Sequence, residues 1–341
     1  MNALLMELVF MTASPSHGVW VAQGYPGDWE SAASVLTEAG VDHLLPCLLY
    51  GITPAYPSNL VTDSRAFPPD TAWIDEMFSV CGETGIEVHS WVVLWRVSRA
   101  DSLLVEELAR EGRLQITSGN DTLPWLCPTD PGNLEFQGAL LEEMMDRYNL
   151  DGVHLDYIRY PDGNSCFCEG CRARFQQHSG HAVYRWPDDV LENGPLHGEY
   201  TDWRVGRITD AVSVFSRLVR ARGLSVSAAV FSNINYGLDC GQDWVEWCGL
   251  GLLDRIYHMN YFGTAAEVEA AVRTQRSLLP RCCYIVSGLG SSIGSLAIST
   301  EEATLQVEAS LRAGADGICH FHLNTTLLRM LPLIRIREST R

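Results

Sequence analysis

The chain has 341 residues, 46% of them hydrophobic and 19% charged, so it can build a sizeable core, and global disorder is excluded. Its net charge is −18, and such an acidic surface repels phosphate backbones, whereas neutral sugars meet no such penalty. Nucleic acid is therefore not an expected partner. All 24 basic residues are arginine, and the lack of a lysine amine excludes Schiff-base aldolases, pyridoxal-phosphate enzymes and Walker P-loops.

Residues 1–17 are predicted to be an N-terminal extension, with a remnant signal peptide as one interpretation. The apolar run there lacks a basic segment and is interrupted by Glu7, which makes it a poor signal. The cytoplasm is therefore slightly favoured, and secretion or the periplasm would follow from a truncated start. No stretch approaches the roughly 20 apolar residues of a membrane span. Eleven scattered cysteines, an odd number, favour a mostly reduced chain. The oligomeric state is left open.

From residue 18 onward, short apolar runs alternate with amphipathic helical stretches, a pattern that predicts eight parallel strands. The predicted strands span 18–23, 43–49, 87–95, 153–158, 224–231, 255–261, 283–289 and 317–323. The predicted helices span 29–39, 71–83, 133–148, 203–222, 243–249, 265–278 and 300–313.

This alternation predicts an α/β fold, a single (β/α)8 TIM barrel over residues 18–341. The alternative is an open doubly wound sheet, which is disfavoured because no glycine-rich phosphate turn follows the first strand. Two connections are unusually long, 96–132 after the third strand and 159–201 after the fourth. Loops after strands lie at the carboxyl face of a barrel, where substrates bind.

The most informative segment is DGVHLDYIRYP, residues 151–161. In a strand, His154 and Asp156 share one face, and Asp156 falls at the carboxyl end. A buried carboxylate at the mouth of a barrel is costly unless it is paired or functional. The segment therefore predicts a functional Asp156, with a capping or salt-bridged aspartate, paired with Arg159, as the alternative.

Several motifs together resemble glycosyl-hydrolase-like family ten, a group of bacterial barrel proteins of which some cleave peptidoglycan glycan strands. They are DGVHLDYIRYP, the preceding LCPTDPGN, the following CFCEGCRARF, and HGVWV, GQDWVEW and YHMNY elsewhere in the chain. The resemblance implies a barrel fold, hydrolysis of glycosidic bonds, and a catalytic position for Asp156. Relatives often carry aspartate where this chain has Asn260, so the resemblance supplies no carboxylate there.

Glycoside cleavage usually needs two carboxyl groups that flank the scissile bond. Asp243, after the fifth strand, is the predicted partner of Asp156, and a helix N-cap ahead of Trp244 is the alternative. Asp239 and Glu246 are weaker candidates.

Aromatic and polar residues gather near the predicted strand ends, where sugar rings stack on aromatic faces and bond to a few polar groups. Ordinary barrel packing is the alternative for most of them. The predicted substrate-binding residues are Trp91, Trp95, His154, Tyr157, Arg159, Gln242, Asn260, Tyr261, His320 and His322. Asp156, Trp91, Asn260 and His320 are expected to converge on one cleft.

Two metal sites are considered. Histidines at predicted inward positions (His89, His154, His258, His320 and His322) permit an amidohydrolase-like metal barrel, although the HxH pair lies on the last strand rather than the first. Cys166, Cys168 and Cys171 form a CxCxxC cluster. They are candidate ligands of a structural zinc, with a fourth ligand such as His178 or His181; a disulfide or free thiols are the alternatives.

The sequence thus favours a glycoside hydrolase that cleaves O-glycosidic bonds in a polysaccharide or oligosaccharide and needs no cofactor for catalysis. A glycan-binding barrel without activity and a metal-dependent amidohydrolase-like enzyme are the alternatives.

Overall fold

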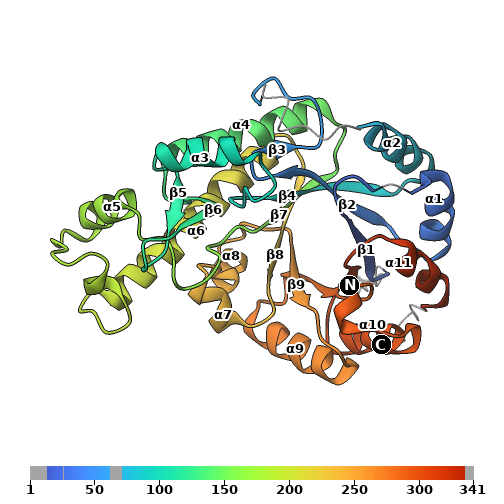
Figure 1. Cartoon of the computed structure of the whole chain (residues 1–341). Helices are drawn as coiled ribbons and strands as arrows, with labels where there is room; N and C mark the ends of the chain where they lie inside the picture. Colours follow the sequence, from blue (N-terminus) through green and yellow to red (C-terminus); the bar gives the residue numbers. More distant parts are fainter. Residues whose placement is uncertain (1–13, 26, 62–70, 335–341) are drawn as a thin grey trace, which may run out of the picture.

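The computed structural model describes residues 14–25, 27–61 and 71–334, and its centre is a closed barrel of eight parallel strands (Figure 1). Each strand pairs in parallel with the next around the ring, and β2 closes on β1. This confirms the predicted (β/α)8 barrel. In chain order the strands are β1 (Ser16–Val21), β2 (His43–Tyr50), β4 (Glu87–Val93), β7 (Gly152–Asp156), β8 (Ser225–Phe231), β9 (Arg255–Asn260), β10 (Tyr284–Leu289) and β11 (Gly317–His320).

Helices surround the barrel (Figure 1). They are α1 (Trp29–Glu38), α2 (Ala72–Thr84), α4 (Pro131–Arg147), α6 (His197–Arg220), α7 (Ile234–Asp239), α8 (Trp244–Gly249), α9 (Ala265–Leu278), α10 (Thr300–Arg312) and α11 (Thr325–Met330). Local signals set their ends. For example, Asp130 caps α4 and Pro131 opens it, and Thr264 and Glu267 form a capping box on α9, which satisfies the free N–H groups of a first turn.

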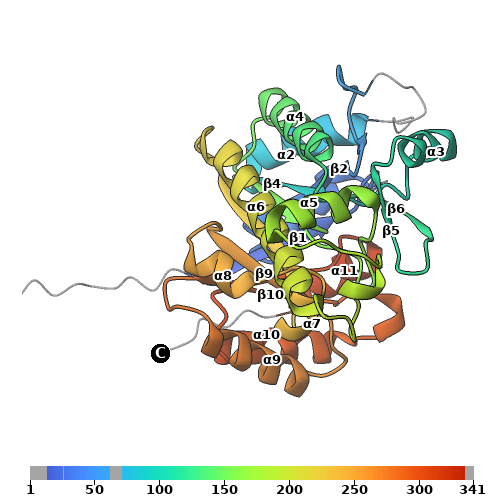
Figure 2. The same ribbon diagram turned by 90° about the vertical axis from the view of Figure 1, so that its left-hand side faces the viewer.

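Both long connections fold into structures of their own at the carboxyl end of the barrel. The first holds α3 (Ser102–Arg110) and an antiparallel hairpin of β5 (Leu114–Ile116) and β6 (Thr122–Leu126). The second holds α5 (Glu169–Ser179) and a short 3-10 helix, Asp188–Val190. Figures 1 and 2 show α5 projecting from the same side of the barrel as the hairpin. A two-residue strand, β3 (Thr53–Pro54), pairs with β2.

Large rings from some strands fill the barrel interior where neighbouring strands carry glycine. A Cβ on Gly18 would lie 2.2 Å from Nε2 of His43, and one on Gly152 would lie 2.3 Å from Nδ1 of His89. Real Cβ atoms do not approach so closely, so these two glycines make room for the two imidazoles. The lower barrel, meaning the end of the interior at the amino ends of the strands, is therefore a packed layer rather than a channel.

The barrel begins slightly earlier than predicted, because β1 starts at Ser16, inside the predicted extension 1–17. Most of that extension, residues 1–13, lies outside the described residues. In the described part of the chain, no helix combines the length and apolarity needed to cross a bilayer.

Candidate active site

Asp156 ends β7 at the mouth of the barrel and is only 6% exposed. Its Oδ2 accepts a hydrogen bond from Nε1 of Trp91, on the neighbouring strand β4, at 2.9 Å. Its Oδ1 accepts one from the backbone N–H of Tyr157 at 2.6 Å. One donor on each oxygen fixes the plane of the carboxyl group.

The surroundings of Asp156 favour its protonated form. Burial raises the pKa of this carboxyl group above its usual value, and this effect exceeds the opposing ones of the Arg159 charge and the two N–H donors. Desolvation penalises the charged form of an acid, and a carboxyl group with a raised pKa is suited to donate a proton near neutral pH.

Cationic and aromatic side chains form one wall beside Asp156, defined here as Arg96, Trp125, Tyr157, Arg159 and Phe231. The guanidinium of Arg159 lies 4.5 Å from the Phe231 ring, 4.6 Å from the Tyr157 ring and 5.4 Å from the Trp125 ring. Nη1 of Arg96 donates to the Tyr157 hydroxyl at 3.0 Å. Stacking on three rings holds the buried positive charge of Arg159 in place.

The ring of Trp91, which bonds to Asp156, belongs to a second group of rings. The Phe321 ring is 6.0 Å from that of Trp91 and 5.4 Å from that of Tyr261. Burial, and to a smaller extent the charge of Asp156, raises the pKa of Tyr261, so Tyr261 lies near the carboxyl group; its role in binding substrate stays a prediction. His322 follows Phe321 and is half-buried, with its ring 4.9 Å from the Phe321 ring.

His154 lies one layer below Asp156, inside the barrel. Its Nε2 accepts a hydrogen bond from Nε1 of Trp20 at 3.1 Å, so its Nδ1 carries the proton that is shared with Oγ of Ser227 at 2.9 Å. Burial lowers its pKa well below the usual value. His154 is a neutral, fully bonded support of the site rather than a free group that faces a substrate.

The prediction that Asn260 and His320 face the cleft is wrong. The Asn260 side chain points toward the helix layer, where it bonds to Gln275 of α9 at 2.7 Å and to Ser287 at 3.0 Å. His320 bonds to Ser291 at 2.7 Å, and its ring lies 5.1 Å from that of His17. Both side chains are fully buried.

Trp95 and Gln242 also lie outside the cleft. The Trp95 ring is fully buried, 6.0 Å from the ring of Phe215 of α6, which is the ordinary packing weighed against substrate binding. The amide of Gln242 bonds to the backbone of β8. Its Oε1 accepts from the N–H of Phe231 at 3.0 Å, and its Nε2 donates to the carbonyl of Ala229 at 3.3 Å. Gln242 therefore holds the strand end and has no free group for a sugar.

Asp243 caps a helix. It precedes α8, and its Oδ1 accepts from the N–H of Glu246 at 2.9 Å, which is the capping role weighed against catalysis. Glu246 lies within α8, where its carboxylate is 3.5 Å from Oγ1 of Thr209. Asp239, at the end of α7, lines two surface hollows. No hydrogen bond joins Asp156 to a second carboxyl group within the described ranges, so the partner carboxylate stays a prediction.

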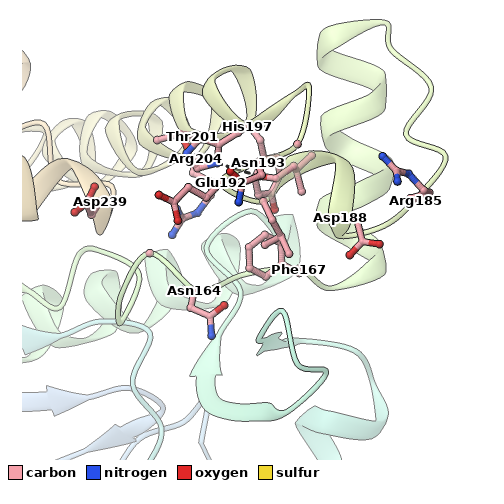
Figure 3. Close-up of a pocket in the computed structure, with 15 residues that line it drawn as sticks. Asn164, Phe167, Arg185, Asp188, Glu192, Asn193, His197, Thr201, Arg204 and Asp239 are labelled. Atoms are coloured by element: carbon pink, nitrogen blue, oxygen red, sulfur yellow. Dashed lines mark hydrogen bonds between the residues drawn. The ribbon is translucent and has the colours of Figure 1, made fainter.

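Two hollows share Asp239 as a lining residue. One, of about 860 Å³, lies against the insertion, which is the long connection between β7 and α6, and has a mostly polar lining that includes Asn164, Glu192, Arg204 and Asp239 (Figure 3). Figure 3 shows Asp239 on the side opposite to Arg185 and Asp188. The second, of about 820 Å³, is also lined by Asp239, and by Phe231 and Tyr261 from the walls around Asp156. Volumes of this size suit a small ligand or several sugar units.

Among the described residues, four buried cysteines form the one group of His, Cys, Asp or Glu with the spacing of metal ligands. They are Cys166, Cys168, Cys171 and Cys127 of the LCPTD motif. The suggestion of His181 as fourth ligand is wrong, because its Nε2 lies 3.4 Å from Glu199 instead; His178 lies in the last turn of α5, outside the group.

Among the described residues, the barrel histidines do not form a ligand set, and the ring of His258 packs 4.7 Å from the Trp244 ring. The amidohydrolase-like alternative is therefore left without ligands there.

Sequence reasoning missed several residues of the site. Phe321, Arg96 and Trp125 were not predicted, although Trp125 stands just before the LCPTD motif. Cys127 lies within that motif, but the sequence does not connect it to the cysteine cluster, because only the folded chain brings the two loops together.

Comparisons with known proteins agree with the barrel fold. The model of the family "Glycosyl hydrolase-like 10" matches residues 49–302. An S-layer-related protein of Niallia circulans is 26% identical over an alignment of 199 residues, and the match covers 48% of this chain and 12% of that protein. The chain thus spans about an eighth of the length of that relative.

Three solved structures with a similar fold carry the names of glycosidases. The PgaB (BpsB) glycoside hydrolase domain of Bordetella bronchiseptica has a TM-score of 0.69 at 12% identity, covering 96% of this chain and 100% of that one. A β-galactosidase of Rahnella sp. R3 has a TM-score of 0.67 at 17% identity, with coverages of 94% and 55%. A chitinase of Chromobacterium violaceum has a TM-score of 0.55 at 10% identity, with coverages of 95% and 100%. At these identities the likeness shows the fold alone.

Proposed function

The chain belongs to the glycosyl hydrolase-like 10 family, and we propose that it cleaves O-glycosidic bonds in a polysaccharide or oligosaccharide, with Asp156 as the general acid. The observation that carries this proposal is the buried carboxyl group at the end of the fourth barrel strand, fixed by Trp91 and raised in pKa. Carbohydrate is the expected substrate class because aromatic rings surround this group and the family and fold are those of glycosidases.

In the proposed reaction, Asp156 gives its proton to the glycosidic oxygen as the bond to the anomeric carbon breaks. The carboxylate that results is stabilised by the positive charge of Arg159 and by the N–H groups of Trp91 and Tyr157. Water then adds its oxygen to the anomeric carbon. If a partner carboxylate forms a covalent intermediate, Asp156 takes the proton of this water and is restored; if the partner activates the water, the partner takes that proton and Asp156 regains its own from solvent.

The two hollows suit a substrate longer than one sugar. Phe231 and Tyr261 border both the site of Asp156 and the second hollow. The first hollow adds polar side chains that suit sugar hydroxyls. We propose that sugar units on either side of the scissile bond occupy these hollows.

A glycan-binding barrel without turnover is the second candidate. It is favoured by Asn260 and Asp243, since the first turns away from the cleft and the second caps α8. Both candidates predict binding of a glycan, and they differ only in cleavage.

A glycan panel with matched variants separates the two. Purified wild-type protein is assayed for reducing ends released from peptidoglycan and from plant and algal polysaccharides, and binding is measured on the same set. Asp156→Asn keeps the size of the side chain and removes the acid, so turnover should fall by about 100-fold or more while binding remains. Asp243→Asn, the control, keeps a good N-cap and should retain turnover. Unchanged turnover in Asp156→Asn would overturn the assignment, and binding without turnover in the wild type would establish the second candidate.

A further inference from the structure

Four sulfur atoms from two separate loops meet at one buried point. The ligand atoms of Cys127, Cys166, Cys168 and Cys171 all lie within 4.8 Å of one another, and all four side chains are buried. Sγ of Cys127 is 3.5 Å from Sγ of Cys171 and 3.8 Å from Sγ of Cys168. A tetrahedral zinc with Zn–S bonds of about 2.3 Å places its sulfurs about 3.8 Å apart, so the spacing matches that of a zinc–tetrathiolate.

The backbone around these cysteines is arranged to bond to thiolates. The N–H of Ile116 donates to Sγ of Cys166, and the N–H of Cys171 donates to Sγ of Cys168, each at 3.4 Å. Nη2 of Arg174 lies 3.9 Å from Sγ of Cys127. N–H donors and a guanidinium around the sulfurs offset the double negative charge that four thiolates leave on a divalent ion.

We propose that these four cysteines bind one structural Zn²⁺ ion, with Cys127 as the fourth ligand. The site is closed, because four protein ligands fill a tetrahedral shell and leave no position for a substrate. This inference is independent of glycosidase activity.

The ion would join the hairpin loop to the insertion. Cys127 directly follows β6, while the other three cysteines lie at the start of the insertion and of α5. The two segments are also joined by hydrogen bonds, such as that of the Phe167 N–H to the carbonyl of Ile116 at 2.7 Å, and by a bridge between Thr117 and Ser165. Trp125, which stacks on Arg159, stands two residues before Cys127, so the metal would also hold one wall beside Asp156.

The first test is the metal content of the full chain purified without added metal. We expect one zinc per chain in the wild type and in the control Cys81→Ser, whose cysteine is buried on α2 outside the cluster. Cys171→Ser and Cys127→Ser should each lose most of the zinc. Cys127→Ser separates the proposed four-ligand site from the three-cysteine cluster alone.

A second measurement keeps the proposal testable if a variant fails to fold. Titration of the folded wild type with an organomercurial should release one zinc as four thiols react, and cobalt should bind with the absorption of a tetrahedral tetrathiolate. Less than stoichiometric zinc with no tetrahedral cobalt spectrum would overturn the proposal. So would iron in place of zinc, disulfides among the four cysteines, or full zinc retention by Cys127→Ser.

Discussion

Trp91→Phe tests the electrostatic picture of the site without any substrate. The substitution keeps an aromatic ring and removes the N–H that donates to Oδ2 of Asp156 at 2.9 Å. A hydrogen bond to a charged group contributes about 1.5–3 kcal/mol, and one pKa unit corresponds to about 1.36 kcal/mol. The pKa of Asp156, already raised by burial, should therefore rise further.

This shift predicts how stability depends on pH. Below the wild-type pKa of Asp156, both proteins carry the neutral acid, and Trp91→Phe loses only a neutral bond and some packing. As the pH rises through the interval between the wild-type and the variant pKa, the variant must ionise a carboxylate that is less well solvated. Its deficit in unfolding free energy should grow there by about 1–1.5 kcal/mol, the excess of a bond to a charged group over a neutral bond, and then level off.

Urea unfolding at a series of pH values measures this deficit. Trp95→Phe is the matched control, because Trp95 is buried outside the cleft against Phe215, and its deficit should not depend on pH. In an Asp156→Asn background the pH dependence caused by Trp91→Phe should vanish. If the deficit of Trp91→Phe is the same at every pH, Trp91 does not bond to an ionising Asp156 and the reasoning fails.

Three further predictions concern side chains that the structure places outside the chemistry. Asp243→Ala should lower the unfolding free energy by about 1 kcal/mol through loss of an N-cap, with kcat unchanged on a verified substrate; a large loss of kcat would restore it as the partner of Asp156. Asn260→Ala should cost about 1–3 kcal/mol in urea unfolding, because Gln275 is left without its partner, while KM stays the same. Gly152→Ala should cost about 1–3 kcal/mol or more, because the new Cβ would lie 2.3 Å from His89, and an unchanged midpoint would contradict the packing described for the lower barrel.

The eight strands could be predicted because each is a short apolar run between amphipathic helices, and the closed ring follows from that alternation. Asp156 could also be located, since a carboxylate at the end of an otherwise apolar strand stands out. For other side chains, the sequence could not predict whether they point into the barrel or toward the helices. Both faces of a parallel barrel strand are buried, so apolar residues do not mark the inner face, and Asn260 and His320 were assigned to the wrong side.

Strand ends are a second source of error, because the alternation of side chains stops there. Trp95 has a φ of 57° and Tyr157 a φ of 54°, so the backbone turns at both exits. The ring of Tyr157 remains in the wall beside Asp156, whereas that of Trp95 packs against α6. The spacing of residues along a strand does not carry this information.

The layer beneath Asp156 adds no positive charge to the site, because His154 is neutral. A protonated His154 would be a cation next to the carboxyl group and would lower its pKa, but both ring nitrogens of His154 are already bonded and burial keeps it neutral. Arg159 is then the cation that offsets the charge of Asp156, and its effect is smaller than that of burial. The barrel thus holds a carboxyl group in a setting that makes ionisation costly, which lowers stability as the pH rises from the ordinary pKa of an aspartate to the raised pKa of Asp156. Asp156→Asn should remove this cost and gain stability at neutral pH while it loses activity, the opposite pairing to that expected of a residue whose role is structural.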